Sequence, residues 1–301
     1  MILPTLRQLR FLVALADELH FGRAAETCLV TQSTLSTGLR ELEDILGAPL
    51  AERTKRSVLM TPLGEEIAAR ARAMLAEAQD IVELAQTQSG TLRGTMKLGT
   101  IPTVGPFLFP RLLPRLRDSY PDLRLYMREE LTEHLIAGLR AGRLDVILIA
   151  LPFETGDLEL EPLFEDDYQL ATAPGHRLIS DRAIGGPDLD DETLLLLERG
   201  HCLQRHALSA FPDTHAKQDE TFAATSLPTL VAMVEQGLGI TLLPQLAIDA
   251  GVTRNTDIQL TPLFGTKPRE VVLAWRKSSA RSEDFRLLAE LLREERARLG
   301  T

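Results

Sequence analysis

Cysteine is scarce in this chain. Its 301 residues include two cysteines, Cys28 and Cys202, which lie far apart in the sequence. Neither belongs to a Cys-x-x-Cys pair or to a cluster of cysteine and histidine residues. This spacing argues against a disulfide scaffold and against a structural zinc site. We therefore expect no cofactor and no bound metal.

Long hydrophobic runs are also missing. No apolar stretch reaches the length that spans a bilayer. The N-terminal segment "MILPTLRQLRFLVALADELHF" interleaves apolar and charged residues, unlike a secretory signal. Hydrophobic residues make up 44% of the chain and charged residues 25%, as in ordinary globular proteins. We expect a cytoplasmic protein with no membrane partner, long enough for more than one domain.

Positive charge is in deficit overall, since the formal net charge is −10. A strongly acidic chain is a poor match for nucleic acid when it is considered as a whole. The first 60 residues, however, carry equal numbers of basic and acidic side chains, and "ERTKRS" at 52–57 forms a compact basic cluster. DNA binding through a small N-terminal module therefore stays open.

The first 60 residues have the pattern of a helix-turn-helix. Apolar residues recur at helical spacing over 5–20, a second short helix begins within "HFGRAAETCLV", and "TQSTLSTGLRELEDILG" follows it directly. Thr31 is a candidate N-cap of this third helix, and Gly47 a candidate stop. The buried stripe of the third helix is predicted to be Leu35, Leu39, Leu42 and Leu46. The alternating segment "ERTKRSVLMTPLGE" then predicts a small hairpin, or wing.

Residues 64–88 predict one long, alanine-rich helix with a heptad repeat. Its apolar stripe consists of Ile67, Ala71, Met74, Ala78, Ile81 and Ala85. Alternating spacings of four and three residues are typical of a coiled coil. A single helix cannot bury such a stripe, so we expect a partner subunit. "SGTLRG" at 89–94 is interpreted as a hinge.

From residue 95 the pattern changes to strands alternating with helices. Strands are expected in "TMKLGTIP", "LRLYMRE" and "LDVILIAL", with helices in "FLFPRLLPRLRDSY" and "TEHLIAGLRAG". Such repeats indicate a parallel sheet covered by helices. "LFEDDYQLATA" is interpreted as a crossover into a second α/β lobe, and "REVVLAWRK" with "EDFRLLAELLREERARL" as the return to the first. Two lobes joined in this way place a ligand cleft between them.

At this point the residues identify a family. "FGRAAETCLVTQSTLSTGLRELEDILGAPLAERTKRSVLMTPLGE" resembles the N-terminal domain of LysR-type transcriptional regulators. "LGTIPTVGP", "LLLLERGHCL" and "LAWRK" are similar to the OxyR branch of that family, which senses hydrogen peroxide. The resemblance implies an α/β chain with three parts. They are a winged helix-turn-helix at 1–61, a linker (dimerisation) helix and hinge at 62–90, and a two-lobed effector domain at 91–301, shaped like a periplasmic binding protein.

The resemblance also implies the lobes and the partners. Lobe I is expected at about 91–165 and 270–301, and lobe II at about 166–269. The expected assembly is a homodimer or homotetramer that binds pseudo-palindromic double-stranded DNA and contacts RNA polymerase. The third helix would enter the major groove, and arginines of the wing would reach phosphates or the minor groove. The DNA-binding candidates are Thr31, Gln32, Ser33, Thr34, Ser36, Thr37, Arg40, Arg53 and Arg56.

These DNA-binding candidates carry two interpretations. Short hydroxyl side chains suit phosphate oxygens, whereas Gln32 and Arg40 are long enough to reach base edges. The plain alternative is that Thr31 only caps a helix and that the arginines are solvated surface residues. The contiguous pattern favours DNA binding. Acidic residues at 41, 43 and 44 are expected to face away from DNA.

The two cysteines receive different interpretations. Cys28 falls on the expected buried side of the second helix, where a free cysteine behaves as a small hydrophobe. Cys202 follows Gly200 and precedes a predicted helix, with His201, Arg205 and His206 nearby. A helix N-terminus and positive neighbours favour the reactive thiolate. An inert loop cysteine is the alternative, and the resemblance favours a redox-sensing one.

By resemblance, the peroxide pocket would draw on Thr103, Thr132, His201 and Arg276. Hydroxyls can hydrogen-bond to peroxide, and a guanidinium can stabilise developing negative charge. Each residue also has a plain alternative. Thr132 is a candidate N-cap, Thr103 sits where a strand meets a helix, and Arg276 could simply form an ion pair.

One departure from the OxyR pattern changes the expected chemistry. The resemblance places a second, disulfide-forming cysteine nine residues after the first, and that position is Phe211. Oxidation could therefore give a sulfenic acid or a mixed disulfide on Cys202 that switches the protein, or could have no structural consequence. A second hypothesis is a regulator that responds to a small metabolite in the inter-lobe cleft. A remote third is a thiol peroxidase-like enzyme, against which the DNA-binding module argues.

Overall fold

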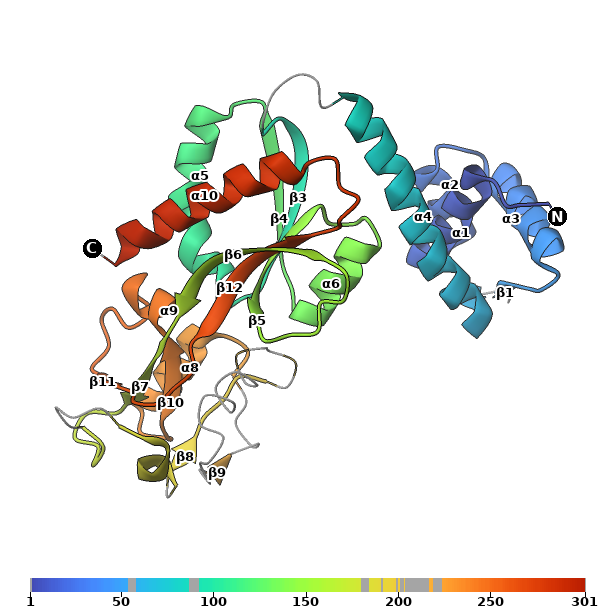
Figure 1. The fold of residues 1–301 in the computed structure, drawn as a ribbon. Coiled ribbons are helices and arrows are strands. Elements are labelled where there is room, and N and C mark those ends of the chain that lie inside the picture. The colour runs from blue at the N-terminus through green and yellow to red at the C-terminus, as the bar shows by residue number, and fades with distance from the viewer. Residues whose placement is uncertain are drawn as a thin grey trace. The chain divides into compact units, whose positions relative to one another are not determined.

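The computed structural model describes two compact units of the chain (Figure 1). The described residues are 2–53, 58–86, 92–179, 184–190, 192–198, 200, 203, 217–218 and 224–300. One unit comprises Met1–Ser89 with Arg140–Arg143, and the other Gly90–Leu139 with Leu144–Thr301. Each unit is described below by itself.

The N-terminal unit contains the predicted helix-turn-helix and hairpin. Thr5 caps the first helix in a capping box with Gln8, and Gly47 ends the third in a left-handed conformation. The core of this unit is made by apolar faces of the first three helices and of the first part of α4. Its elements are α1 (Leu6–Glu18), α2 (Phe21–Thr27), α3 (Gln32–Leu46), β1 (Ala51–Arg53), β2 (Val58–Met60) and α4 (Pro62–Gln86).

The buried stripe of α3 is one residue shorter than predicted. Leu35, Leu39 and Leu42 are buried, but Leu46 is 37% exposed at the end of the helix. The core of this unit lies against the first three turns of α3, so the last turn extends beyond it. Leu46 is therefore a surface residue.

The heptad stripe of α4 divides into two parts. Ala71 is buried in the core of the N-terminal unit, and Ile67 packs against the same core. Met74 is 54% exposed and Ile81 is 70% exposed. The first part of the stripe is thus already covered within this unit, whereas the second part presents exposed apolar side chains.

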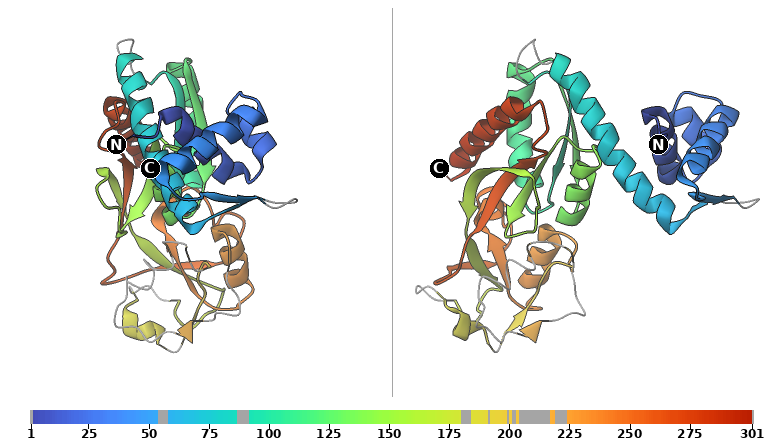
Figure 2. Two further views of the ribbon diagram at one scale, coloured as in Figure 1. Left: turned by 90° about the vertical axis from the view of Figure 1, so that its right-hand side faces the viewer. Right: turned by 45° about the vertical axis from the view of Figure 1, so that its right-hand side comes forward.

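The second unit contains a five-stranded mixed sheet, the sheet of lobe I. Its order is β4-β3-β5-β12-β6; β3 is parallel to β4 and β5, whereas β12 is antiparallel to β5 and β6. Helices α5 and α10 cover one face and α6 the other (Figure 2). The elements are β3 (Gly94–Thr100), α5 (Gly105–Ser119), β4 (Leu123–Glu129), α6 (Thr132–Arg140), β5 (Val146–Leu151), β6 (Glu159–Asp166), β12 (Arg269–Trp275) and α10 (Ser282–Leu299).

Lobe II is built around a small antiparallel sheet. Strand β7 lies between β10 and β11 and is antiparallel to both, so the main sheet of lobe II is antiparallel rather than parallel as predicted. Parallel pairing in this lobe is limited to the short strands β8 and β9 and to isolated bridges among the described residues. The apolar residues of α8, β7 and β10 form a second core. The elements are β7 (Tyr168–Thr172), the 3-10 helix η2 (Gly186–Leu189), β8 (Thr193–Leu194), β9 (Lys217–Gln218), α8 (Leu227–Glu235), β10 (Thr241–Pro244), α9 (Gln245–Asp249) and β11 (Gln259–Pro262).

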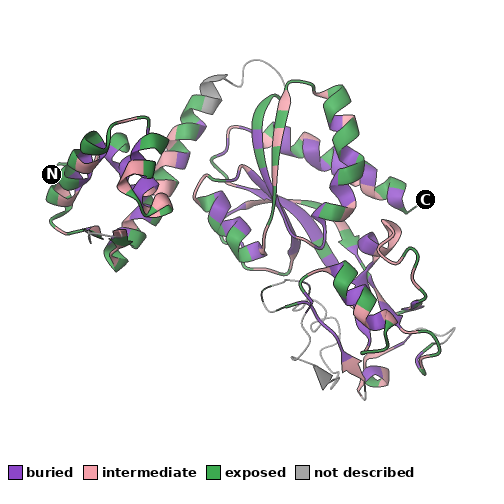
Figure 3. Ribbon diagram, turned by 180° about the vertical axis from the view of Figure 1, so that it is seen from behind, coloured by how far each residue is buried: buried purple, intermediate pink, exposed green. Residues whose placement is uncertain are grey.

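Two crossovers join the lobes. The chain leaves lobe I at the end of β6 and returns at the start of β12. Buried residues follow the strands of the lobe I sheet and the helix surfaces packed against them (Figure 3). The side chain of Leu246 in α9 belongs to the core of lobe I, whereas its neighbour Ala247 belongs to the core of lobe II. Helix α9 therefore packs into both lobes.

A buried charge pair fixes the beginning of the effector domain to its last helix. Arg281 and Asp284 pair with an Nε–Oδ2 distance of 2.9 Å, and both are less than one tenth exposed. Asp284 accepts the backbone N–H of Leu92 at 2.8 Å, and Arg281 donates to the carbonyls of Arg93 and Thr95. The segment before and within β3 is thus bonded to the N-terminal end of α10.

Membrane-spanning helices and metal-binding clusters are both absent from the described residues. None of the helices in the described part of the chain is long and apolar enough to cross a membrane. Within the same residues, no three side chains of His, Cys, Asp or Glu are grouped in a way that could hold a metal ion.

The contact between α4 and the residue before β1 generates a stability prediction at Gly64. A β-carbon placed there would lie 2.0 Å from the carbonyl oxygen of Leu50, a backbone atom that cannot move aside easily. We expect Gly64→Ala to lower the free energy of unfolding by about 1–3 kcal/mol, the usual cost of overpacking. Differential scanning calorimetry of the full chain measures this. Gly185→Ala is the control, since its added methyl meets nothing nearer than 3.8 Å; equal effects of the two would contradict the steric account.

Candidate functional site

The N-terminal end of α3 presents a polar, exposed surface. Thr31 Oγ1 accepts the backbone N–H of Thr34 at 3.2 Å, so Thr31 is indeed the N-cap. Its hydroxyl also lies 2.9 Å from Ser33 Oγ and 2.8 Å from Thr34 Oγ1. Six of the predicted DNA-binding side chains are exposed and Ser36 is half-buried; the exposed ones are Thr31, Gln32, Ser33, Thr34, Thr37 and Arg40.

Two of the three acidic residues of α3 are hydrogen-bonded within the unit. Glu41 accepts a hydrogen bond from the Gln8 side chain at 3.2 Å, and Glu43 accepts the backbone N–H of Leu50 at 2.8 Å. These two carboxylates therefore contribute to the packing of α3 against its neighbours.

A shallow groove between α1 and α3 adds one residue to this surface. Its lining includes Ser33, Thr34, Thr37 and Glu41 of α3 and Arg7, the second residue of α1, so Glu41 borders this surface rather than facing away from it. Arg7 was not among the predicted DNA-binding residues. Arg7 could have been identified from the sequence, because it is a basic residue in the first turn of a helix that packs against α3.

The wing is described only in part. Arg53 is the last residue of β1 and pairs with Val58 in the antiparallel register of the hairpin. Arg56 lies outside the described residues.

Cys28 is buried in the N-terminal unit, as predicted. It is 7% exposed in the core, and its thiol faces the carbonyl of Arg10 at 3.9 Å. Burial raises the pKa of the Cys28 thiol, against a smaller opposing influence of the Arg10 charge. The thiol form is therefore favoured over the reactive thiolate.

Two predicted pocket residues, Thr103 and Thr132, lie at the same edge of the lobe I sheet. Parallel strands β3 and β4 both end there, and Glu130 donates its backbone N–H to the carbonyl of Thr100 at 3.1 Å. Thr103 follows β3 and is 2% exposed; Thr132 follows β4 and is fully buried. The structure therefore places both hydroxyls beyond the carboxyl ends of neighbouring strands.

Thr132 does not act as an N-cap. It is the first residue of α6, and its hydroxyl oxygen is buried with no hydrogen-bond partner among the described residues. A buried hydroxyl without a partner costs about 1–3 kcal/mol. Buried polar groups in folded proteins usually have a partner, so the Thr132 hydroxyl has room for a hydrogen bond with a water molecule or a small ligand.

Arg269, rather than Arg276, is the arginine beside Thr103. Arg269 donates from Nη1 to Thr103 Oγ1 at 2.8 Å and from Nη2 to the Thr103 carbonyl at 3.0 Å. Arg276 instead donates to the carbonyls of Leu139 and Leu144. The sequence-based pocket grouped Arg276 with Thr103, and the structure corrects this.

The direction of β12 is the physical reason for the correction. Because β12 is antiparallel to β5, Glu270 pairs with Leu151 at the end of β5, and Trp275 pairs with Val146 at its start. Arg269, the first residue of β12, therefore lies at the sheet edge with Thr103. Arg276, which follows the end of β12, lies at the opposite edge. Arg276 was assigned by the family resemblance, and the antiparallel direction of β12 carries it to the edge away from Thr103.

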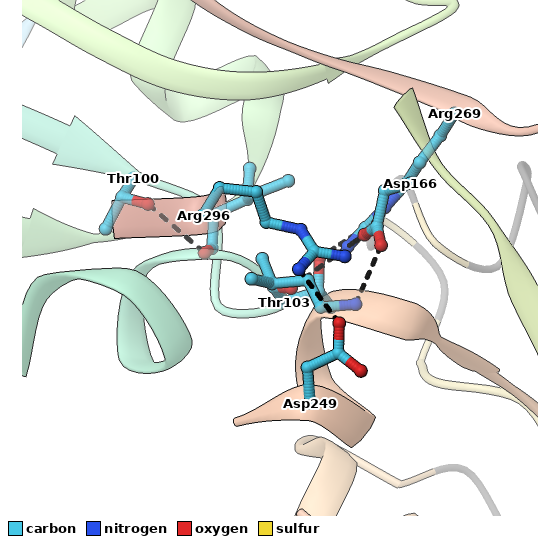
Figure 4. Close-up of polar contacts among 8 residues, drawn as sticks. Thr100, Thr103, Asp166, Asp249, Arg269 and Arg296 are labelled. Atoms are coloured by element: carbon cyan, nitrogen blue, oxygen red, sulfur yellow. Dashed lines mark hydrogen bonds and ion pairs between the residues drawn. The ribbon is translucent and has the colours of Figure 1, made fainter. Parts of the chain in front are cut away.

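Arg269 is part of a fully buried ion pair (Figure 4). Asp166 Oδ2 accepts from Arg269 Nε at 3.0 Å and from Nη2 at 2.8 Å. Neither side chain is exposed to solvent. Asp166 Oδ1 accepts the backbone N–H of Leu246 in α9 at 2.8 Å.

Gly200, two residues before Cys202, lies close to Leu131, the residue before Thr132. Gly200 is described, and a β-carbon placed on it would lie 2.9 Å from the side chain of Leu131. Its φ of +108° is one that residues with a side chain rarely adopt, which explains glycine here. Leu203 is buried in the lobe II core. His201, Cys202 and Phe211, together with Arg205 and His206, lie outside the described residues.

A helix-turn-helix with a hairpin, joined by a long helix to a two-lobed α/β unit, defines a DNA-binding regulator with an effector domain. Comparison with known proteins agrees: residues 6–65 match the family of bacterial regulatory helix-turn-helix proteins of the LysR type, and residues 89–297 match the LysR substrate binding domain. The chain belongs to the LysR family of transcriptional regulators, whose members are not enzymes.

Individual relatives are similar over nearly the whole chain. The transcriptional regulator EstR of Acinetobacter baylyi is 41% identical over 292 residues, 97% of each chain. The DNA-binding transcriptional dual regulator OxyR of Escherichia coli is 40% identical over 289 residues, covering 96% of this chain and 94% of its own.

Solved structures give the same picture. A full-length cysteine-to-aspartate variant of OxyR from Pseudomonas aeruginosa superimposes with a TM-score of 0.80 at 40% identity, over 97% of this chain and 98% of that one. A cysteine-to-serine variant of Corynebacterium glutamicum OxyR with bound hydrogen peroxide gives 0.65 at 34% identity, over 99% and 96%. This regulator is therefore OxyR-like in sequence and in fold.

The surroundings of Cys28 generate a reactivity prediction. Because burial raises the pKa of this thiol, its thiolate fraction at neutral pH is smaller than that of an exposed cysteine. We expect iodoacetamide to leave Cys28 unmodified in the folded chain and to modify it after denaturation in guanidinium chloride. Peptide mass spectrometry measures both. Equal modification rates before and after denaturation would show that Cys28 is accessible.

Proposed function

We propose that this regulator senses hydrogen peroxide through Cys202 and controls oxidative-stress genes. The proposed parts are a DNA-binding domain at 1–61, a linker helix and hinge at 62–90, and a redox-sensing effector domain from 91 onward. The observation that carries the proposal is the sheet edge with Thr103 and Thr132. There a buried threonine hydroxyl lacks a partner among the described residues, and the residue before that threonine lies close to Gly200, two residues before Cys202.

The chemistry proposed for Cys202 is a two-electron oxidation. The thiolate sulfur attacks one oxygen of hydrogen peroxide and the O–O bond breaks. The other oxygen leaves with the bonding electron pair as hydroxide, which takes up a proton to become water. Sulfur is oxidised to sulfenic acid (Cys–S–OH) and the peroxide is reduced. Hydroxyl donors and a cationic group near the leaving oxygen would stabilise its developing charge.

The hydroxyls at the edge suit this reaction. Thr132 has its hydroxyl oxygen buried without a partner in the described part of the chain, so it is available to a small polar ligand. Thr103 accepts from Arg269, so its own proton is directed to a different acceptor. His201 adds an imidazole next to Cys202 in the sequence. A solved relative, the OxyR variant of Corynebacterium glutamicum, has hydrogen peroxide bound.

The proposed product differs from an intramolecular disulfide. The chain has Phe211 nine residues after Cys202, and Cys28 is buried in the other unit. The sulfenic acid is therefore the switching species, or it condenses with a small thiol to give a mixed disulfide and water. Either product adds polar bulk at Cys202.

On the DNA side, the exposed end of α3 is proposed to dock in the major groove of a pseudo-palindromic site as a homodimer or homotetramer. The proposed contacts are Thr31, Gln32, Ser33, Thr34, Ser36, Thr37 and Arg40, with Arg53 and Arg56 in the wing. Hydroxyls and arginines bind phosphates, and Gln32 and Arg40 reach base edges. Transcriptional control would then proceed through contact with RNA polymerase.

Peroxide sensing predicts a specific adduct. The full chain is treated with a small excess of hydrogen peroxide, the sulfenic acid is trapped with dimedone, and peptides are analysed by mass spectrometry. We expect the adduct on Cys202 and not on Cys28. DNase footprinting of a target promoter is expected to change on oxidation in the wild type and in Cys28→Ala, but not in Cys202→Ser.

Two outcomes would contradict this function. Absence of an adduct on Cys202 together with an unchanged footprint would exclude redox sensing and would favour a metabolite in the inter-lobe cleft. Continued consumption of peroxide in large excess over protein would instead indicate a peroxidase-like activity.

Base recognition by α3 generates a separate prediction. We expect Gln32→Ala to weaken binding to the preferred site by about 1–3 kcal/mol and to weaken binding to random DNA much less. Fluorescence anisotropy at several salt concentrations measures both, and a phosphate contact would instead change the salt dependence. Asp44→Asn, at an exposed residue of the far end of α3, is the control and should not weaken binding. A uniform loss on both DNAs would show that Gln32 does not read bases.

A further inference from the structure

One carboxylate at the junction of the lobes receives donors from two distant segments. Asp166 Oδ2 accepts two hydrogen bonds from Arg269, and Asp166 Oδ1 accepts the backbone N–H of Leu246. The neighbouring carbonyl of Asp167 accepts the backbone N–H of Gln245 at 2.8 Å. Asp166 ends β6, where the chain leaves lobe I, and Arg269 begins β12, where it returns. The pair therefore bonds both crossovers to each other and to α9.

The other side of the Arg269 guanidinium faces the candidate sensing edge. It donates to the Thr103 hydroxyl and to the Thr103 carbonyl (Figure 4). Its position is set on one side by Thr103 and on the other by Asp166. Because the side chains of Arg269 and Asp166 are entirely buried, the carboxylate supplies the charge that makes the guanidinium tolerable there.

The direction of the Thr103 hydroxyl follows from this arrangement. A guanidinium has only donors, so Thr103 Oγ1 must accept from it. The hydroxyl proton is then directed to a different acceptor, and the threonine is held as a donor. A fixed donor stabilises negative charge that develops on a reacting oxygen without reorganisation during the reaction.

We propose that Asp166 is a positioning residue for the peroxide reaction of Cys202. It holds Arg269 in place, and Arg269 in turn orients the Thr103 hydroxyl toward the peroxide oxygen that leaves as hydroxide. Asp166 itself does not touch peroxide. This inference rests on the proposed function, and it adds a residue at the crossover between the lobes to the site.

The chain offers a matched control for the test. Asp249 of α9 pairs with Arg296 of α10 at 2.8 Å, also across the lobe junction, and Arg296 lies over the ring of Phe164. This second pair lies between α9 and α10, whereas the pair of Asp166 and Arg269 extends to Thr103. Asp249→Asn therefore weakens the junction as Asp166→Asn does, but leaves the sensing edge unchanged.

The experiment measures the second-order rate constant for oxidation of Cys202 by hydrogen peroxide in the full chain. Samples are quenched with an alkylating agent over time, and the Cys202 peptide is quantified by mass spectrometry. We expect Asp166→Asn to slow the reaction by about 10- to 100-fold, the effect of misplacing a reacting arrangement. The rate constant of Asp249→Asn should stay within about twofold of the wild-type value, which is much less than the change expected when a reacting group is misplaced. Circular dichroism and DNA binding of the reduced variants report folding.

A double variant separates positioning from a purely structural role. If Asp166 acts only through Arg269, adding Asp166→Asn to Arg269→Gln has no further effect on the rate constant. If either single variant fails to fold, the double variant is compared directly with the wild type, because neither charge is then left unpaired in the interior; a wild-type rate constant in the double variant would overturn the proposal.

Four further results would overturn the proposal. A folded Asp166→Asn chain that reacts at the wild-type rate removes the role of Asp166. An equal slowing in Asp249→Asn assigns the effect to the lobe junction as a whole. A further slowing in the double variant shows that Asp166 acts by another route. Failure of wild-type Cys202 to react overturns the proposed function itself, which distinguishes that failure from the other three.

Discussion

The buried pair of Asp166 and Arg269 is the interaction on which the effector domain depends. It joins the end of β6, the start of β12, the first turn of α9 and the loop after β3, so all four segments meet at one pair of side chains. Removing one partner of such a pair typically costs about 3–5 kcal/mol, because the other charge is left buried and unpaired. Replacing either residue alone is therefore expected to destabilise the domain more than replacing both by uncharged residues. Together with α9, which packs into both cores, the pair links the two lobes.

Much of the fold could be predicted from local pattern. The alternation in "LRLYMRE" predicts a strand over 123–129, which is where β4 lies, and the crossover predicted in "LFEDDYQLATA" contains the step from β6 to β7. Strand direction could not be predicted in the same way, because periodicity is identical for parallel and antiparallel strands. This is why the sheet was expected to be parallel. Arg276 was assigned to the pocket by resemblance, and the antiparallel direction of β12 places it at the other edge of the sheet. The exposed Leu46 has a related origin: helical spacing shows which face is apolar, but not how far the core extends along it.

The sequence was more informative about the DNA-binding surface than the net charge suggests. A chain with net charge −10 nevertheless presents an exposed cluster of hydroxyl, amide and guanidinium groups at the start of α3. Its acidic neighbours Glu41 and Glu43 are bonded to groups within the unit and so contribute to the fold. Charge at the level of a helix face, rather than of the whole chain, is the relevant quantity for association with DNA.

The bond between Leu92 and Asp284 has a mechanical consequence. The first described residue of the effector unit is hydrogen-bonded to the beginning of α10, and the far end of the same helix is bonded through Arg296 to α9 of lobe II. A single helix of 18 residues, about 27 Å long, therefore connects the point where the chain enters this unit with the crossover region. A displacement of Leu92 would therefore act on the end of a helix rather than on a loop. The C-terminal helix is thus bonded at one end to the start of the unit and at the other to lobe II, although it contributes no residue to either candidate site.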